Sequence, residues 1–231
     1  MAGEFSGIVR DAFLKRGHEA VSCDLFPSER PGPHIQGDVR YLDFAQFDLM
    51  IAHPPCTHLA VSGARWFRGK EAEQVEALAF VEYLLSRPVP RIALENPVSV
   101  ISTKVRRPDQ VIQPWQFGHG EVKATCLWLK GLPKLTPTDV VAGRVARVHR
   151  EPPGPERWRN RSRTFEGIAA AMADQWGEPI IEVSDGSVVC SSCGPVYARD
   201  EIAYGNTWDK HPEWVPGPAE YLRQRHARVH S

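Results

Sequence analysis

The residues best suited to covalent chemistry stand in the stretch HPPCTH, where Cys56 follows two prolines and a short apolar run, Asp48 to Ala52. Proline fixes φ and donates no backbone hydrogen bond, so we expect a strand to end here and to present the cysteine on a rigid turn. A second apolar run, RIALENP, ends in Glu95 and Asn96. The ends of strands in an open α/β sheet are where reacting groups stand, which makes Cys56 and Glu95 a candidate pair.

A cysteine beside a carboxylic acid is the combination needed for addition to a pyrimidine. The thiolate can attack C6 if an acid protonates N3, because that proton stabilises the electron density pushed onto the ring. Addition turns C5 into an enamine carbon that can attack an electrophilic methyl group. A buried structural cysteine is the ordinary alternative for an isolated residue of this type. The paired prolines and Glu95 favour a nucleophile.

A nucleoside-cofactor site is predicted near the start of the chain. The glycine turn EFSG, Glu4 to Gly7, opens an apparent helix, and Asp24 follows at the end of an alternating strand. A glycine turn followed about 20 residues later by an acid is typical of α/β proteins that hold a ribose. NAD and S-adenosylmethionine share this geometry, and Asp38 in GDV is a further acid at a strand end. The combination with Cys56 favours the sulfonium cofactor.

Helices and strands alternate through most of the chain, which predicts an α/β fold with a mainly parallel sheet. We expect helices at residues 7–18, at Glu71 to Leu85 with an apolar face that includes Val75 and Val81, and over RTFEGIAAAMADQWG. Strands are expected in EAVSCDL, FDLMIAH, RIALENP and ATCLWLKG. From Thr136 to Trp158 proline, glycine and arginine indicate a loop-rich insertion. We therefore predict a catalytic domain over 1–183 and a small appendage over 184–231.

Composition bounds the location and the partners. The 231 residues carry 28 basic and 28 acidic side chains and five cysteines, without an apolar run of membrane-spanning length or a signal sequence. We therefore expect an intracellular protein with reduced thiols and no membrane contact. Net charge argues neither for nor against nucleic acid, but the arginine-rich stretch from Arg144 to Arg163 is suited to phosphates. A solvent-exposed loop without a binding role explains such a charged stretch equally well.

The ordered set of these motifs resembles the cytosine-C5 DNA methyltransferases, especially the short phage and prophage members, over about residues 3–177. The resemblance implies a Rossmann-like, S-adenosylmethionine-dependent methyltransferase fold and methyl transfer to a flipped-out cytosine of DNA, giving 5-methylcytosine. It implies catalytic roles for Cys56, Glu95, Asn96, Lys123 and Thr125. It implies cofactor contacts for Phe5, Ser6, Gly7, Asp24, Leu25, Asp38, Val39, Pro55 and Gly167. It implies a bacterial or phage-infected cytoplasm, with no obligate protein partner.

Two departures from the family shape these expectations. Only Met1 to Glu4 precede Phe5, so either the first strand is truncated or the start of the chain is misplaced. The recognition insertion spans only about 136–161, which predicts a short or relaxed sequence context, with Arg157, Arg159, Arg161 and Arg163 mainly holding phosphates.

Several alternatives stay open on the sequence alone. The same machinery could transfer a larger group, for example from carboxy-S-adenosylmethionine, with Arg161 and Arg163 binding the carboxylate. The substrate could be a free cytosine nucleotide, and the chain could be a non-catalytic DNA-binding relative. A nicotinamide oxidoreductase explains neither the PPC nor the ENP motif.

Other polar residues receive a structural interpretation. His53, His58 and His119 are expected to be hydrogen-bonded structural histidines. In the tail, Cys190 and Cys193 form half of a zinc-ribbon-like site that His211, His226 and His230 could complete. A free dithiol is the favoured reading there, with structural zinc as the alternative.

Overall fold

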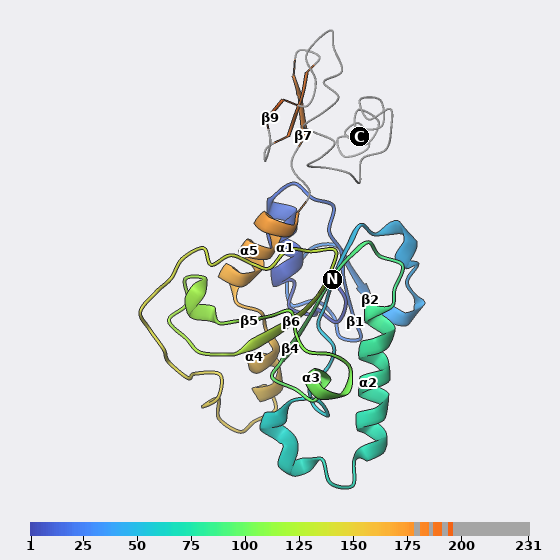
Figure 1. The fold of residues 1–231 in the computed structure, drawn as a ribbon, viewed down its shortest axis with the longest axis vertical. Helices are drawn as coiled ribbons and strands as arrows, with labels where there is room; N and C mark the ends of the chain where they lie inside the picture. Colours follow the sequence, from blue (N-terminus) through green and yellow to red (C-terminus); the bar gives the residue numbers. More distant parts are fainter. Residues whose placement is uncertain (178–180, 185–186, 191–193, 196–231) are drawn as a thin grey trace. The chain divides into compact units, whose positions relative to one another are not determined.

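The computed structural model describes residues 1–177, 181–184, 187–190 and 194–195 (Figure 1). The chain divides into two compact units, Met1–Trp176 and Gly177–Ser231. All the residues of the candidate catalytic pair and of the predicted cofactor site lie in the first unit.

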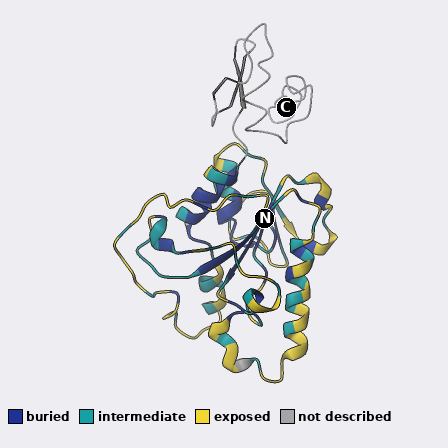
Figure 2. Cartoon of the chain, in the orientation of Figure 1, coloured by how far each residue is buried: buried dark blue, intermediate teal, exposed yellow. Residues whose placement is uncertain are grey.

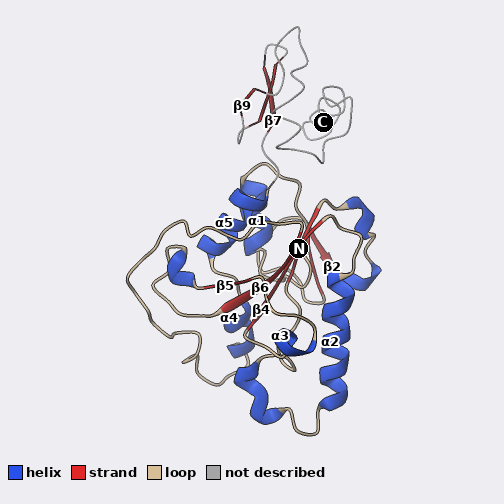
Figure 3. Ribbon diagram, viewed as in Figure 1, coloured by secondary structure: helices blue, strands red, loops and turns tan. Residues whose placement is uncertain are grey.

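A mixed β-sheet forms the centre of the first unit (Figure 3). Its strands are β1 (Ser22–Asp24), β2 (His34–Gln36), β3 (Leu49–Ala52), β4 (Arg91–Pro97), β5 (Gln110–Ile112) and β6 (Thr125–Lys130). β1 pairs in parallel with β2, and β3 pairs in parallel with β4. β6 lies between β4 and β5 and is antiparallel to both. The α/β expectation is therefore confirmed, whereas the sheet is mixed and a mainly parallel sheet is not confirmed.

The first segment of the chain joins the two groups of strands. Ala2 forms parallel bridges to Cys23 of β1 and to Ala52 of β3. The amide of Ala2 donates to the carbonyl of Ile51, and the amide of His53 donates to the carbonyl of Ala2. A single bridging residue thus links the two groups of strands, between β1 and β3.

Helices cover both faces of the sheet, and two apolar clusters fill the space beneath them. The helices are α1 (Ile8–Lys15), α2 (Glu71–Leu85), α3 (Ile101–Lys104), α4 (Arg157–Ser162) and α5 (Glu166–Trp176). Side chains of α1 and α5 pack with Ile51 and Ala93, while those of α2 and α3 pack with Met50 and Ile92. Successive strand residues point to opposite faces, so neighbouring residues of β3 and β4 join different clusters. Figure 2 shows the buried residues gathered along the sheet and the inner helix faces.

The predicted helices and strands of the first unit are present. The helix predicted over Glu71 to Leu85 is α2 with the same bounds. Its predicted apolar face is only partly right, because Val81 is fully buried but Val75 is 65% exposed. The buried residues of α2 are Val81 and Leu84, and both lie close to its C-terminal end.

The second unit contains an antiparallel sheet of β7 (Ile181–Ser184), β8 (Ser187–Cys190) and β9 (Gly194–Pro195). Cys190 is the last residue of β8, whereas Cys193 and the three tail histidines lie outside the described residues. Within the described part of the chain no helix is long and apolar enough to cross a membrane.

Candidate functional site

Cys56 stands on a tight turn directly after β3. The strand ends at Ala52, and the carbonyl of Cys56 accepts the amides of Leu59 and Ala60 at 3.0 and 2.8 Å. Pro54 is buried, Pro55 is exposed and Cys56 is half-buried. The prolines end the backbone ladder because they lack an amide hydrogen. The thiol is therefore held at the strand end and is only partly covered.

Asn96 fastens this turn to the neighbouring strand. β4 runs parallel to β3, with Ala52 opposite Leu94, so the residues beyond Ala52 lie beside Glu95 and Asn96. The buried side-chain amide of Asn96 donates to the carbonyl of Pro54 at 2.9 Å. This bond continues the ladder where proline has interrupted it. Asn96 is thus a positioning residue for the cysteine turn.

Glu95 lies one residue earlier on β4 and is 7% exposed. Its Oε2 lies 2.9 Å from Nδ1 of His53, the residue that follows β3. Glu95 Oε1 has no hydrogen bond within the described residues. Glu95 is therefore held through one carboxyl oxygen. His53 is hydrogen-bonded, as predicted, and its partner is Glu95.

Electrostatics couple Cys56 to Glu95. Burial raises the pKa of the Cys56 thiol, and the negative charge of Glu95 raises it further, while Lys123 and Arg161 act in the opposite direction. Burial alone would raise the pKa of Glu95, but the hydrogen bond from His53 and the charge of Lys123 outweigh it, so this pKa is lowered. At neutral pH the free protein therefore holds a protonated thiol beside an ionised carboxylate.

Two further residues assigned to catalysis lie just before and at the start of β6. Lys123 is half-buried, donates from Nζ to the carbonyl of Arg163 at 3.3 Å, and acts on both Cys56 and Glu95 through its charge. Thr125 is buried and donates its hydroxyl to the carbonyl of Lys123 at 3.2 Å. Lys123 thus belongs to the same cluster as Cys56 and Glu95. The hydroxyl of Thr125 instead makes a local hydrogen bond to the backbone two residues earlier.

Gly3, which precedes the predicted cofactor turn, lies directly against His53, the residue that follows β3. Gly3 has a φ of +71°, and a Cβ on it would lie 2.6 Å from the carbonyl oxygen of His53. Such an approach is open only to glycine. The two segments that the resemblance assigns to cofactor and nucleophile are therefore neighbours in space.

Glu4 organises this turn, a role that the sequence reading missed. Its buried carboxylate accepts the amides of Val9 and Arg10 at 2.8 and 3.3 Å and the hydroxyl of Ser6 at 3.1 Å. It thereby satisfies the free amides at the start of α1. Ser6 is buried and has its oxygen in use, and Gly7 provides the left-handed conformation, with a φ of 73°, from which α1 begins.

The two acids assigned to the cofactor differ in how many of their carboxylate oxygens already have protein partners. Asp24 ends β1, and its Oδ1 accepts the amide of Phe26 at 2.9 Å. Burial raises its pKa, although the backbone amide of Phe26 acts in the opposite direction. Asp38 instead caps the short 3-10 helix Val39–Tyr41 and pairs with Arg40, which lowers its pKa. Asp24 has an oxygen to offer a ligand, whereas Asp38 is committed to its own turn.

The hydrophobic residues assigned to the cofactor have unequal exposure. Phe5 and Val39 are buried, while Leu25 is 67% exposed. Phe5 contacts Phe26 and Trp158, and the ring centroids of Phe26 and Trp158 are 5.0 Å apart. Trp158 belongs to α4, so the short insertion packs directly on the predicted cofactor segment.

The four arginines assigned to DNA have different environments. Arg163 binds Glu29 through Nε and Nη2 at 2.8 and 2.7 Å, and Arg159 pairs with Glu156 and Glu29. Arg161 forms no hydrogen bond or ion pair with any described residue, yet its charge reaches Cys56. Arg157 begins α4 and is half-buried. Arg161 is therefore the arginine that the structure brings to the cysteine.

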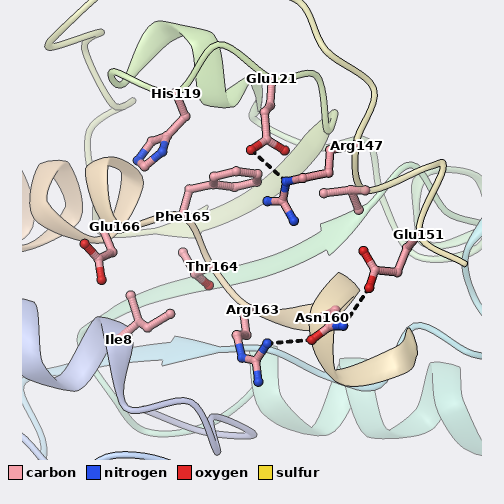
Figure 4. Close-up of a pocket in the computed structure, with 11 residues that line it drawn as sticks. Ile8, His119, Glu121, Arg147, Glu151, Asn160, Arg163, Thr164, Phe165 and Glu166 are labelled. Atoms are coloured by element: carbon pink, nitrogen blue, oxygen red, sulfur yellow. Dashed lines mark hydrogen bonds and ion pairs between the residues drawn. The ribbon is translucent and has the colours of Figure 1, made fainter. Parts of the chain in front are cut away.

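A charged cavity of about 460 Å³ adjoins this cluster (Figure 4). Its walls include Arg163 and Phe165, and both lie close to the ammonium group of Lys123. Two polar chains cross it, one joining Glu121 to Arg147 and the other running from Glu151 through Asn160 to Arg163. Cys56 and Glu95 do not line this cavity, so it is adjacent to the reactive pair rather than around it.

Gly167, assigned to the cofactor, has a packing role. A Cβ on it would overlap the carbonyl oxygen of Phe117, and its amide donates to Nε2 of His119 at 2.9 Å. The start of α5 is thereby fixed against the 117–119 segment. In the described residues no group of three or more potential metal ligands is present.

Comparison of the chain with protein-family models and with curated proteins gives no match.

Proposed function

We propose that the protein transfers a methyl group from S-adenosylmethionine to C5 of cytosine in DNA through a covalent adduct on Cys56. The observation that carries this proposal is the placement of Cys56 and Glu95 near the adjacent ends of β3 and β4, where the charge of Glu95 raises the pKa of Cys56. A nucleophile and an acid at one sheet edge are what addition to a pyrimidine requires.

The ionisation of the pair supports an internal proton transfer. With the pKa of Cys56 raised and that of Glu95 lowered, the resting pair holds its one proton on sulfur. Moving this proton to Glu95 creates the thiolate and the acid together. The Cys56 Sγ–C6 bond then forms, the ring electrons shift toward N3, and the proton passes from Glu95 to N3.

The later steps restore both groups. S-adenosylmethionine supplies the electrophilic methyl group that C5 attacks. Loss of the C5 proton to water expels the thiolate, and N3 returns its proton to Glu95. Transfer of this proton from Glu95 back to the Cys56 thiolate then restores the resting thiol and carboxylate. The positive charges of Lys123 and Arg161 stabilise the thiolate at both ends of the reaction.

A Rossmann-like arrangement is supported by the course of the chain through the sheet. From Ala2 the chain moves outward to β1 and β2, and then returns to β3 on the other side of Ala2. In such a sheet ligands bind beyond the strand ends at the point where the order reverses. Gly3, His53 and Cys56 are all near this point.

The residues present suit S-adenosylmethionine in part. Asp24 offers a half-buried carboxylate oxygen for ribose hydroxyls, and Phe5 offers an apolar ring to the nucleoside. Leu25 is exposed and able to cover a bound purine. Asp38 fits less well, because Arg40 already neutralises it. We therefore assign the nucleoside to Phe5, Asp24 and Leu25, and we give Asp38 only the support of its own turn.

DNA is the substrate we favour. The reacting atoms of a paired base are inaccessible to a thiolate, so a duplex cytosine would have to be flipped out at a cost of a few kcal/mol. Arg157 and Arg161 have no carboxylate partner among the described residues and are the arginines we assign to phosphates. A free cytosine nucleotide would meet the same cations, and a non-catalytic relative would have no use for the coupled ionisation of Cys56 and Glu95.

One observation favours a second candidate, transfer of a carboxymethyl group from carboxy-S-adenosylmethionine. Arg161 is half-buried beside the cysteine with no carboxylate partner among residues 1–177. A cation in that setting suits a ligand carboxylate. Arg163, in contrast, is already paired with Glu29.

The mass of the modified nucleoside distinguishes these functions. Purified protein is incubated with unmodified DNA and either cofactor, and the DNA is digested to nucleosides for mass spectrometry. One added methylene on deoxycytidine supports methyl transfer, and a carboxymethyl mass supports the second candidate. Cys56→Ala is the control. No modified cytidine in DNA or in free nucleotides with either cofactor would refute the proposed function.

A further inference from the structure

We propose that His53 is the positioning residue for the acid Glu95: it fixes one carboxyl oxygen through an Nδ1–H bond and so directs the other toward the base. This role rests on the proposed function.

The strand register places the two side chains together. Ala52 and Leu94 are the last pair of the parallel β3–β4 ladder, so His53 and Glu95 form the next position, side by side on one face. The backbone of His53 is itself held, because its amide donates to the carbonyl of Ala2 at 2.8 Å. The side chains of His53 and Glu95 are 11% and 8% exposed, and Nδ1 and Oε2 are 2.9 Å apart.

The surroundings of the imidazole select one tautomer. Glu95 Oε2 accepts a hydrogen bond when the carboxylate is ionised, so Nδ1 must carry the hydrogen. His53 Nε2 is buried and has no hydrogen-bond partner among the described residues. A hydrogen on Nε2 would be an unpaired buried donor, which is costly. The surroundings therefore place the hydrogen of the imidazole on Nδ1.

This bond determines how Glu95 can act. A glutamate side chain without a partner has several rotamers, and holding Oε2 leaves the carboxyl group one way to face the base. After Glu95 gives its proton to N3, the Nδ1–H group also stabilises the carboxylate that remains. His53 need not touch the substrate to have both effects.

The tautomer can be measured without any substrate. Long-range proton–nitrogen NMR of the full chain identifies the imidazole signals of His53 as those lost in His53→Asn. We expect the hydrogen to be found on Nδ1, the nitrogen that faces Glu95. A ring protonated at Nε2 alone would overturn the assignment, whatever the protein does to DNA.

Two variants separate positioning from proton exchange. His53→Asn keeps an amide donor near the position of Nδ1, and His53→Leu keeps volume without a donor. The readout is the single-turnover rate of covalent addition to DNA containing 5-fluorocytosine, with S-adenosylmethionine. We expect His53→Leu to slow addition about 10- to 100-fold and His53→Asn to remain within about threefold of wild type. Melting temperatures of the variants control for folding.

The pH dependence adds a readout that a merely structural residue would not move. The charged and titratable groups around Glu95 are His53 and Cys56 after β3, Lys123 before β6, and Cys126 on β6. Because the His53 bond lowers the pKa of Glu95, its loss in His53→Leu should move the acid limb of the rate profile to higher pH. His53→Asn should restore the limb.

The outcomes are distinguishable. Addition by wild type with an equally fast His53→Leu would overturn the role of His53 and leave the proposed function standing. Asparagine as slow as leucine would also overturn positioning and would indicate proton exchange by the imidazole. No adduct with wild type would refute the proposed function, and the role of His53 with it.

Discussion

Replacing Glu95 with glutamine removes the proposed acid while leaving the geometry almost unchanged. Glutamine has the shape of glutamate, and its carbonyl oxygen can still accept the hydrogen bond from Nδ1 of His53. It has no acidic proton to give to N3. General acid catalysis contributes about 10²- to 10⁴-fold, so addition of Cys56 to cytosine should slow by that factor, or about 3 to 5 kcal/mol in the barrier.

The same change should make the cysteine more reactive toward a simple electrophile. The negative charge of Glu95 helps to raise the pKa of Cys56. Without that charge more of the thiol is ionised at a given pH, so alkylation by iodoacetamide should become faster. One substitution is thus expected to change two reactions of one thiol in opposite directions.

The assay compares both rates in the same preparation. Alkylation of Cys56 is followed by peptide mass spectrometry, and addition to 5-fluorocytosine DNA is followed by gel retardation under denaturing conditions. Glu121→Gln, in a carboxylate that pairs with Arg147 in the adjacent cavity, is the matched control. A fall in both rates would indicate lost structure. Unchanged addition would refute the assignment of Glu95 as the acid.

Three further predictions concern ionisation and packing. The pKa of Glu95 lies below its ordinary value of 4.5, and the pKa of Cys56 lies above its ordinary value of 9.0. At any pH between these two pKa values the pair holds one proton, so the fraction of protein with a thiolate and a protonated Glu95 is constant. The rate of addition should therefore be flat from about pH 5 to about pH 9, fall below this range as the thiolate is lost, and fall above it as the acid is lost; a steep change near pH 7 would contradict this. Gly3→Ala should cost about 1–3 kcal/mol more in urea unfolding than Gly17→Ala, because both glycines have positive φ but only the first would place its Cβ against backbone; equal costs would rule out the close approach. Glu29→Gln should change stability by less than about 1 kcal/mol, since its ion pairs are partly exposed, yet trypsin should cut α4 faster; unchanged cleavage would show that these pairs do not hold the helix.

Local pattern was sufficient to predict the elements that carry the site. The bounds of α2 follow from apolar spacing and the proline beyond it, and the strands before Cys56 and Glu95 follow from short apolar runs that end in proline or polar residues. These positions also placed the two residues at strand ends. The sequence pattern could not predict the direction of each strand relative to its neighbours. β6 is antiparallel to both β4 and β5, and this pairing joins segments that are distant in the sequence.

The partners of the site residues depend on register and on tertiary contact. His53 meets Glu95 only because Ala52 is opposite Leu94, and a shift of one residue would separate them. The residue type alone did not mark His53 as a partner of Glu95. The one available signal was its position directly before the two prolines and directly after its strand.

The insertion shows the same limit. Charge along 144–163 indicated a phosphate-binding stretch, but it could not tell which arginines have acidic partners. Glu29 is far from Arg163 in sequence, and Trp158 reaches Phe5 and Phe26 only in the folded chain. Arg161 differs from Arg159 and Arg163 because they pair with Glu29 and it does not, and this difference is visible only in the folded chain.

The most direct test of the central claim is to locate the covalent bond. Duplex DNA with a single 5-fluorocytosine is incubated with the protein and S-adenosylmethionine, and the trapped complex is digested and mapped by mass spectrometry. The fluorine cannot leave as the C5 proton does, so the adduct should persist and should be found on the peptide that contains Cys56. A bond to another residue, or an adduct that survives in Cys56→Ala, would contradict the account.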